Sequence, residues 1–114
     1  MIRRKNECTQ EIREHMRGGD GQALITNLFE KEELLNSRML GTLTLEPGCS
    51  VGVHQHDGEQ EYFYVLKGSP VYIDDDQEIQ LYEGDVTICE DGHSHGICNR
   101  SQETVQVLAC ILLK

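Results

Sequence analysis

The chain has 114 residues, of which 38% are hydrophobic and 26% charged, a balance typical of one globular domain. Twenty acidic residues outnumber ten basic ones, and the formal net charge of -10 argues against binding to the phosphate backbone of nucleic acids. No apolar stretch approaches the roughly 18 residues that a membrane-spanning helix needs, and no apolar segment of a secretion signal follows the N-terminus. We therefore expect a cytoplasmic protein with no nucleic-acid or membrane partner.

The first segment is expected to differ from the remainder of the chain. Residues 7–17 are compatible with one or two helical turns, and glycines at 18, 19 and 21 would end them. We expect residues 1–21 to form an N-terminal extension with a glycine-rich break, and residues 22–114 to form the single folded domain. From Gln22 apolar and polar residues alternate with a period of two, which predicts a strand.

Short strands are then expected along the rest of the chain. The polar segment 29–37 connects the first strand to a second at 39–45, which the turn residues 46–48 end. Further strands are expected at 50–56, 61–67, 70–73, 78–81, 85–89, 95–99 and 105–113. The acidic residues 74–76 form a solvated hairpin tip, because the glycine and terminal glutamate of a calcium loop are missing. Nine short strands without a long helix predict an all-β, antiparallel sandwich or barrel.

Five cysteines are spread over the sequence without a C-x-x-C pair: Cys8, Cys49, Cys89, Cys98 and Cys110. An odd number without this spacing argues against a disulfide framework and against a zinc knuckle. We expect reduced thiols that act mostly as small core residues.

Four of the five histidines fall in two H-x-H pairs, His54 with His56 and His93 with His95. Residues two apart on a strand project from the same face, so the imidazoles of His54 and His56 point the same way. After the turn at 57–58 we expect the chain to return so that Glu61 faces them at cross-strand distance. Glu59 shares the parity of Glu61 and is the rival carboxylate. His15 lies apart from both pairs and is expected at the surface.

These two stretches resemble the paired motifs of the cupin superfamily. The matching residues are Gly48, His54, His56, Glu61 and Gly68 in the first motif, and Gly84, Gly92, His95 and Asn99 in the second. Glu90 stands where the family usually has proline, which affects the rigidity of a turn and no ligand. The resemblance implies an antiparallel jelly-roll β-barrel, the cupin-like double-stranded β-helix. It also implies a homodimer and a metal held by His54, His56, Glu61 and His95, with Glu61 preferred to Glu59.

Three neutral imidazoles and one carboxylate form a mixed nitrogen and oxygen site. Such a site suits one divalent transition metal ion, namely Mn, Fe, Co, Ni, Cu or Zn. Four protein ligands leave one or two positions of the metal, two if it is octahedral, open for water, dioxygen or a bidentate molecule. With Glu61 ionised, the net charge of metal and ligands is near +1, so we expect a small anionic molecule to bind.

Strand alternation places Phe63 and Val65 on the same face as Glu61, where we expect them to line a pocket. Asn99 and His93 are further candidates for the pocket or for the layer behind the metal ligands, and an exposed position is the favoured alternative for His93. Tyr62 and Tyr64 would lie on the outer face, covered by an N-terminal strand, a second subunit or packing within the monomer. The pattern places no arginine inside, since Arg38 and Arg100 flank strands, and the pocket is expected to be rather apolar.

Two functions are consistent with these residues. One is a divalent-metal-dependent enzyme, such as a dioxygenase, isomerase or decarboxylase, acting on a small anionic or oxygen-rich molecule. The other is a non-catalytic module that binds a metal and a small ligand. An enzyme would need a general acid or base, and the spacing places none of the candidates, which are His93, Tyr62, Tyr64 and the cysteines.

Overall fold

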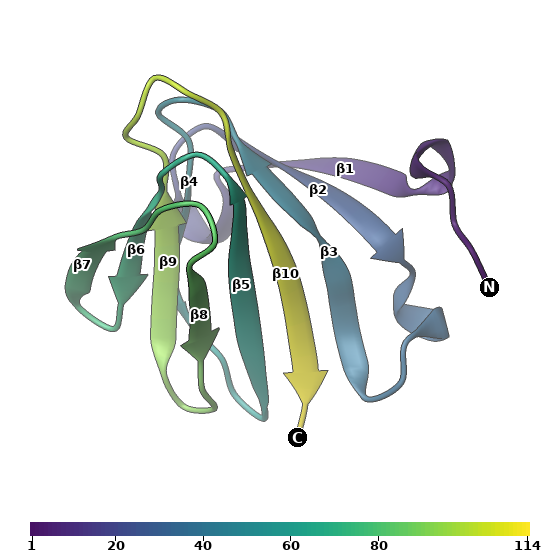
Figure 1. Cartoon of the computed structure of the whole chain (residues 1–114). Helices are drawn as coiled ribbons and strands as arrows, with labels where there is room; N and C mark the ends of the chain where they lie inside the picture. The colour runs from purple at the N-terminus through teal and green to yellow at the C-terminus, as the bar shows by residue number, and fades with distance from the viewer.

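The computed structural model describes all 114 residues and consists of ten strands in two antiparallel sheets (Figure 1). The six-stranded sheet has the order β1-β2-β3-β10-β5-β8, and the four-stranded sheet has the order β4-β9-β6-β7. The strands are β1 (Thr9–Glu14), β2 (Gln22–Phe29), β3 (Ser37–Leu45), β4 (Ser50–Gln55), β5 (Glu59–Lys67), β6 (Val71–Asp74), β7 (Gln77–Gln80), β8 (Val86–Cys89), β9 (Ser94–Cys98) and β10 (Val105–Leu113). Three short 3-10 turns complete the chain: η1 (Lys5–Glu7), η2 (Met16–Gly18) and η3 (Lys31–Glu33).

The nine strands expected from the period of two are all present, and the all-β class is confirmed. The expectation of helical turns at residues 7–17 is wrong, because Thr9–Glu14 forms β1, the edge strand next to β2. All six residues of β1 are exposed, so no apolar alternation marks them in the sequence. The segment is extended because its backbone pairs with β2, in a register that sets Ile12 opposite Leu24.

The interior lies between the two sheets and is filled by alternate residues of the strands. On β10, for example, every second residue from Val105 to Ile111 is buried. Burial of a Val or Leu side chain stabilises the fold by about 1.5–3 kcal/mol. The buried apolar cluster comprises Ala23, Ile25, Leu43, Leu45, Val51, Phe63, Val65, Tyr72, Leu81, Ile97, Val105, Val107 and Ala109. Polar side chains are buried in the same interior, and these are His56, Glu61, His95, Asn99 and two serines.

The pairing of β4 differs from the expected hairpin. β4 pairs with β9, which places His54 opposite His95, whereas β5 pairs with β10 and β8 in the other sheet. Glu61 on β5 therefore faces the imidazoles from the opposite sheet and not from a neighbouring strand.

The structure contains no helix with the length and apolar character that a membrane span requires.

Candidate metal centre

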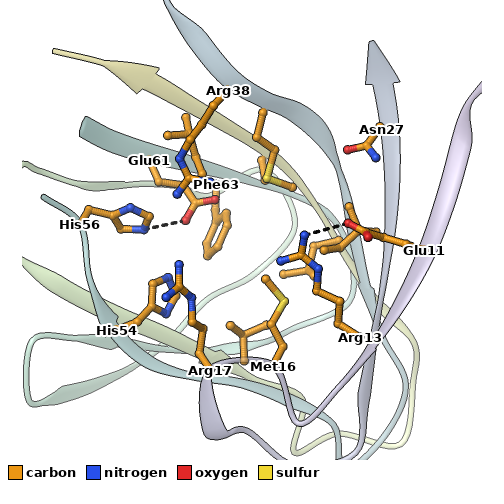
Figure 2. Close-up of a pocket in the computed structure, with 16 residues that line it drawn as sticks. Glu11, Arg13, Met16, Arg17, Asn27, Arg38, His54, His56, Glu61 and Phe63 are labelled. Atoms are coloured by element: carbon orange, nitrogen blue, oxygen red, sulfur yellow. Dashed lines mark hydrogen bonds and ion pairs between the residues drawn. The ribbon is translucent and has the colours of Figure 1, made fainter. Parts of the chain in front are cut away.

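Four side chains converge in the interior between the two sheets. His54, His56, Glu61 and His95 each offer one ligand atom, and these atoms lie within 4.8 Å of one another. Glu61 Oε1 is 3.0 Å from His56 Nε2 and 2.9 Å from His95 Nε2, and the two Nε2 atoms are 3.0 Å apart. Figure 2 shows His56 and Glu61 facing each other, with His54 below them. The group could hold a metal ion.

The second ring nitrogen of each histidine is held by a neighbour. His54 Nδ1 donates to the Gly52 carbonyl at 2.8 Å, and His56 Nδ1 donates to Glu59 Oε2 at 2.5 Å. His95 Nδ1 lies 2.9 Å from the Tyr72 hydroxyl, which can accept its proton. A ring that donates from Nδ1 turns the lone pair of Nε2 toward the centre, which is the orientation that a metal ligand requires.

This arrangement fits a divalent transition metal. The three imidazole centroids are 4.9 Å apart in every pair, and the rings are inclined by 63–73° to one another. When both rings are neutral and donate from Nδ1, the lone pairs of His56 Nε2 and His95 Nε2 meet the Glu61 carboxylate at 3.0 and 2.9 Å without a hydrogen between them. Buried acceptors at this distance are unfavourable unless a cation or a proton lies among them. Nitrogen and oxygen donors are ligands that such metals accept.

A proton competes with a metal for this centre. The hydrogen bond to Glu61 raises the pKa of His56, and it outweighs burial, which lowers it. Burial would raise the pKa of Glu61, but hydrogen bonds with His56 and His95 outweigh it and lower the pKa. Burial lowers the pKa of His54, which favours its neutral form. Metal binding at these residues is therefore expected to release protons.

Glu59, the rival carboxylate, lies behind His56. Its two oxygens accept hydrogen bonds from Arg38 Nε and Nη2, both at 2.7 Å, and one of them also holds His56 Nδ1. The hydrogen bonds from Arg38 lower the pKa of Glu59 to about 2. Glu59 thus orients the ring of His56 from the side away from the centre, while Glu61 faces the centre itself.

A cavity of about 110 Å³ opens beside this centre and is lined by three of its members, His54, His56 and Glu61 (Figure 2). Phe63 lines it and stacks on His95, with centroids 5.0 Å apart and planes inclined by 15°. The expectation of a pocket without an arginine is wrong, because three guanidinium groups line the cavity. The expectation of a rather apolar lining is not contradicted, since eight of the sixteen lining residues are hydrophobic. Its charged residues outside the metal centre are Glu11, Arg13, Arg17 and Arg38, and its apolar residues include Met16, Ile25, Met39, Leu43 and Val51.

Three further residues named as pocket candidates do not line this cavity. Val65 is buried in the apolar core. Asn99 is buried and donates to the carbonyls of Leu45 and Glu103 at 2.8 and 2.7 Å, so it anchors a loop. The side chain of His93 is 58% exposed and pairs with Asp75 at 3.0 Å.

Tyr62 and Tyr64 are on the outer face of β5, as expected from the alternation. The N-terminal strand β1 does not cover them, because it lies in the same sheet and is separated from β5 by β2, β3 and β10. Packing within the monomer does not cover Tyr64 either, which is 44% exposed.

Comparisons with known proteins agree on one family. Residues 41–111 match the model of the Cupin domain family. A curated oxalate-binding protein of Thermotoga maritima is 38% identical over 114 residues, which cover 99% of this chain and 94% of that protein. The tetracenomycin polyketide synthase protein TcmJ of Streptomyces glaucescens is 31% identical over 94 residues, which cover 82% of this chain and 61% of TcmJ.

Solved structures give the same result. A crystal structure from Thermotoga maritima, described as a predicted oxalate decarboxylase, has a TM-score of 0.95 and 36% identity, with both chains covered in full. The polyketide cyclase RemF of Streptomyces resistomycificus has a TM-score of 0.79 and covers 99% of this chain and 80% of its own. Its identity of 19% supports a shared fold only.

Proposed function

The chain belongs to the cupin family, and on that premise we propose that it binds a small dicarboxylate of the oxalate class through a divalent metal. The proposed ligands of the metal are His54, His56, Glu61 and His95. The observation that carries the proposal is that three of these side chains, His54, His56 and Glu61, line a small cavity together with the unpaired guanidinium group of Arg17. A 38% identical relative of almost the same length is named an oxalate-binding protein, which supports this choice of ligand.

The charge and size of the cavity support an anion with few atoms. A bound metal supplies positive charge and open positions for carboxylate oxygens. Neutral imidazoles and one ionised carboxylate leave the centre with a net charge near +1 once a divalent metal is bound. The guanidinium group of Arg17 adds to the local positive potential, whereas Arg13 and Arg38 are paired with Glu11 and Glu59. A volume of about 110 Å³ has room for a small acid.

Binding without turnover is favoured over catalysis by the groups that line the cavity. Outside the metal centre, the lining offers arginines, which remain protonated, and Glu11, which is paired with Arg13 at 2.9 Å. The acid or base candidates Tyr62, Tyr64, His93 and the cysteines are all absent from the lining. No group is thus placed to donate or accept a proton at a bound ligand. The alternative is a metal-dependent enzyme, and observed turnover of the acid would favour it.

The metal part of the proposal is tested by elemental analysis of protein purified without chelator. We expect close to one equivalent of divalent transition metal in the wild type and its loss in the His54→Ala, His56→Ala double variant. His93→Ala is the matched control, because His93 is exposed and off the cavity, and it should retain the metal. A double variant that kept its metal would overturn the assignment.

The ligand part is tested by calorimetric titration of oxalate into metal-loaded and chelator-treated protein. We expect saturable binding only when the metal is present. Oxalate at 100 times its Kd should stabilise the loaded protein by about 2.7 kcal/mol. Release of carbon dioxide from oxalate would select the enzyme, and oxalate binding by the chelator-treated protein would refute the dependence on the metal.

We further propose a homodimer that packs through the outer face of the six-stranded sheet. Tyr62 and Tyr64 on β5 pair with Ile88 and Val86 on β8, and Tyr64, Val86 and Ile88 are 44–65% exposed. A patch of large apolar side chains on an edge strand favours association with a second copy. Light scattering should give about twice the 12.9 kDa of one chain at micromolar concentration, and a mass near 12.9 kDa would refute the proposal.

A cytoplasmic location is also proposed. All five cysteines are free thiols in the structure, and this supports a reducing compartment. Fractionation of cells that express the protein tests it, with recovery in the cytosolic fraction as the expected result.

A further inference from the structure

The backbone at Arg17 has an unusual conformation. Its φ and ψ are 53° and 30°, in the left-handed region, and His15 and Gly18 also have positive φ values of 50° and 81°. For a residue with a side chain this conformation costs about 1–2 kcal/mol. Such strain persists only where the surrounding structure imposes it, and it is found most often at functional sites.

Two glycines allow the turn η2 to contact β4 backbone to backbone. A Cβ on Gly52 would lie 2.0 Å from the Arg17 carbonyl oxygen, and a Cβ on Gly19 would lie 2.2 Å from the Ser50 carbonyl oxygen. The Ser50 amide also donates to the Asp20 carbonyl at 2.9 Å. Since β4 carries His54 two residues beyond Gly52, these contacts fix Arg17 relative to the metal centre.

The side chain of Arg17 reaches from this turn into the cavity. Figure 2 shows it beside His54, with its guanidinium group directed toward the space below Glu61. The other two arginines of the cavity already have partners, because Arg13 pairs with Glu11 and Arg38 pairs with Glu59 through two hydrogen bonds. Arg17 forms no ion pair and no side-chain hydrogen bond in the structure. Its donors are therefore free for a ligand.

We propose that Arg17 binds the outer oxygens of a dicarboxylate held at the metal centre, and so selects dicarboxylates over monocarboxylates. The inference rests on the proposed function, because it needs the acid to be bound at the metal. A short dicarboxylate that gives one oxygen of each carboxylate to the metal keeps two oxygens free. A guanidinium group matches such a pair of oxygens with two parallel hydrogen bonds. A monocarboxylate that gives both of its oxygens to the metal has no pair of outer oxygens left for the two parallel hydrogen bonds of Arg17.

The residue lies outside the part of the chain that defines the family. The Cupin domain match covers residues 41–111, whereas Arg17 precedes β2. In this proposal the N-terminal segment selects the acid through Arg17, and residues of the two sheets hold the metal.

The test compares Arg17→Gln, Arg17→Lys and the control Arg13→Gln as Mn²⁺-loaded proteins. Metal affinity is measured by electron paramagnetic resonance of free Mn²⁺, and oxalate and acetate affinities are measured by calorimetry. In Arg17→Gln we expect oxalate binding to weaken by about 10- to 100-fold, because a charge-assisted contact is lost. Acetate and Mn²⁺ affinities should change by less than about 3-fold. Arg17→Lys should recover part of the loss, because it restores the charge without the fork.

The possible results separate the two proposals. Unchanged oxalate affinity in Arg17→Gln, or an equal loss in Arg13→Gln, would overturn the role of Arg17 while leaving the proposed function intact. A large loss of Mn²⁺ affinity in Arg17→Gln would also overturn it, since Arg17 would then support the metal centre. Absence of oxalate binding by the loaded wild type would refute the proposed function, and this inference with it. Circular dichroism melts establish that each variant is folded.

Discussion

Gly52→Ala is expected to displace the turn that carries Arg17. The new Cβ would lie 2.0 Å from the Arg17 carbonyl oxygen and 2.9 Å from its carbonyl carbon, whereas ordinary contacts begin at 3.4 Å. These atoms belong to the backbone, so no side-chain rotation relieves the clash. β4 is held by its pairing with β9, while η2 is a three-residue turn with no buried residue. The turn therefore moves, and Arg17 moves with it.

The magnitude follows from this clash. Overpacking of this kind costs about 1–3 kcal/mol in the free energy of unfolding. At about 4 °C per kcal/mol for a domain of this size, Tm should fall by about 4–12 °C. Scanning calorimetry of the chelator-treated protein measures this loss, and titration of the Mn²⁺-loaded protein with oxalate measures the effect on binding. We expect oxalate binding to weaken more than Mn²⁺ binding, because displacements near 1 Å already disrupt oriented contacts.

Gly84→Ala is the matched control for Gly52→Ala. Gly84 has a φ of 90°, and a Cβ there would meet no atom within 4 Å, so its cost comes from the backbone conformation alone. It should lower stability by about 1 kcal/mol and leave oxalate binding unchanged. A Gly52→Ala variant with wild-type Tm and wild-type oxalate affinity would refute the reasoning that links η2, β4 and the cavity.

Two other substitutions test the surroundings of the centre. Asn99→Ala leaves the carbonyls of Leu45 and Glu103 without their hydrogen-bond donor. We expect the free energy of unfolding, measured in urea, to fall by about 2–3 kcal/mol while the metal content stays unchanged. Loss of the metal would contradict this and give Asn99 a role at the metal centre. Glu59→Gln tests pH dependence in the chelator-treated protein. Because the pKa of Glu59 is lowered from 4.5 to about 2, its contribution to stability is complete above pH 4.5 and is lost as the pH falls toward 2. The urea midpoint of Glu59→Gln should therefore fall less steeply than that of the wild type over this range, and parallel curves would contradict the pairing with Arg38.

The sequence predicted the features that depend on local patterns. Alternation with a period of two located nine strands, and it placed Phe63 inward and Tyr64 outward on β5. The H-x-H spacing brought His54 and His56 to one face because side-chain direction on a strand repeats every two residues. These inferences needed no knowledge of which strands are neighbours.

The features that sequence analysis missed all depend on pairing between distant segments. β1 carries no apolar alternation, and its extended form comes from its pairing with β2. β4 pairs with β9 and sets His54 opposite His95, 41 positions away in the chain. Glu61 reaches these imidazoles from the opposite sheet, because β5 belongs to the six-stranded sheet. Glycines 18, 19 and 21 indicated a break in the chain after Arg17, but no local pattern indicated that the turn packs on Gly52 or that Arg17 enters the cavity.

The net charge of -10 and an anionic ligand are compatible because the relevant field is local. Charges at a distance are screened over about 8 Å at physiological ionic strength, so the acidic surface acts weakly on a ligand inside the cavity. Three of the ten basic residues line this one cavity, and two of them are neutralised by Glu11 and Glu59. What remains is the guanidinium of Arg17 beside a centre of net positive charge when a metal is bound. The acidic exterior can therefore limit nonspecific association while the cavity remains selective for a dianion.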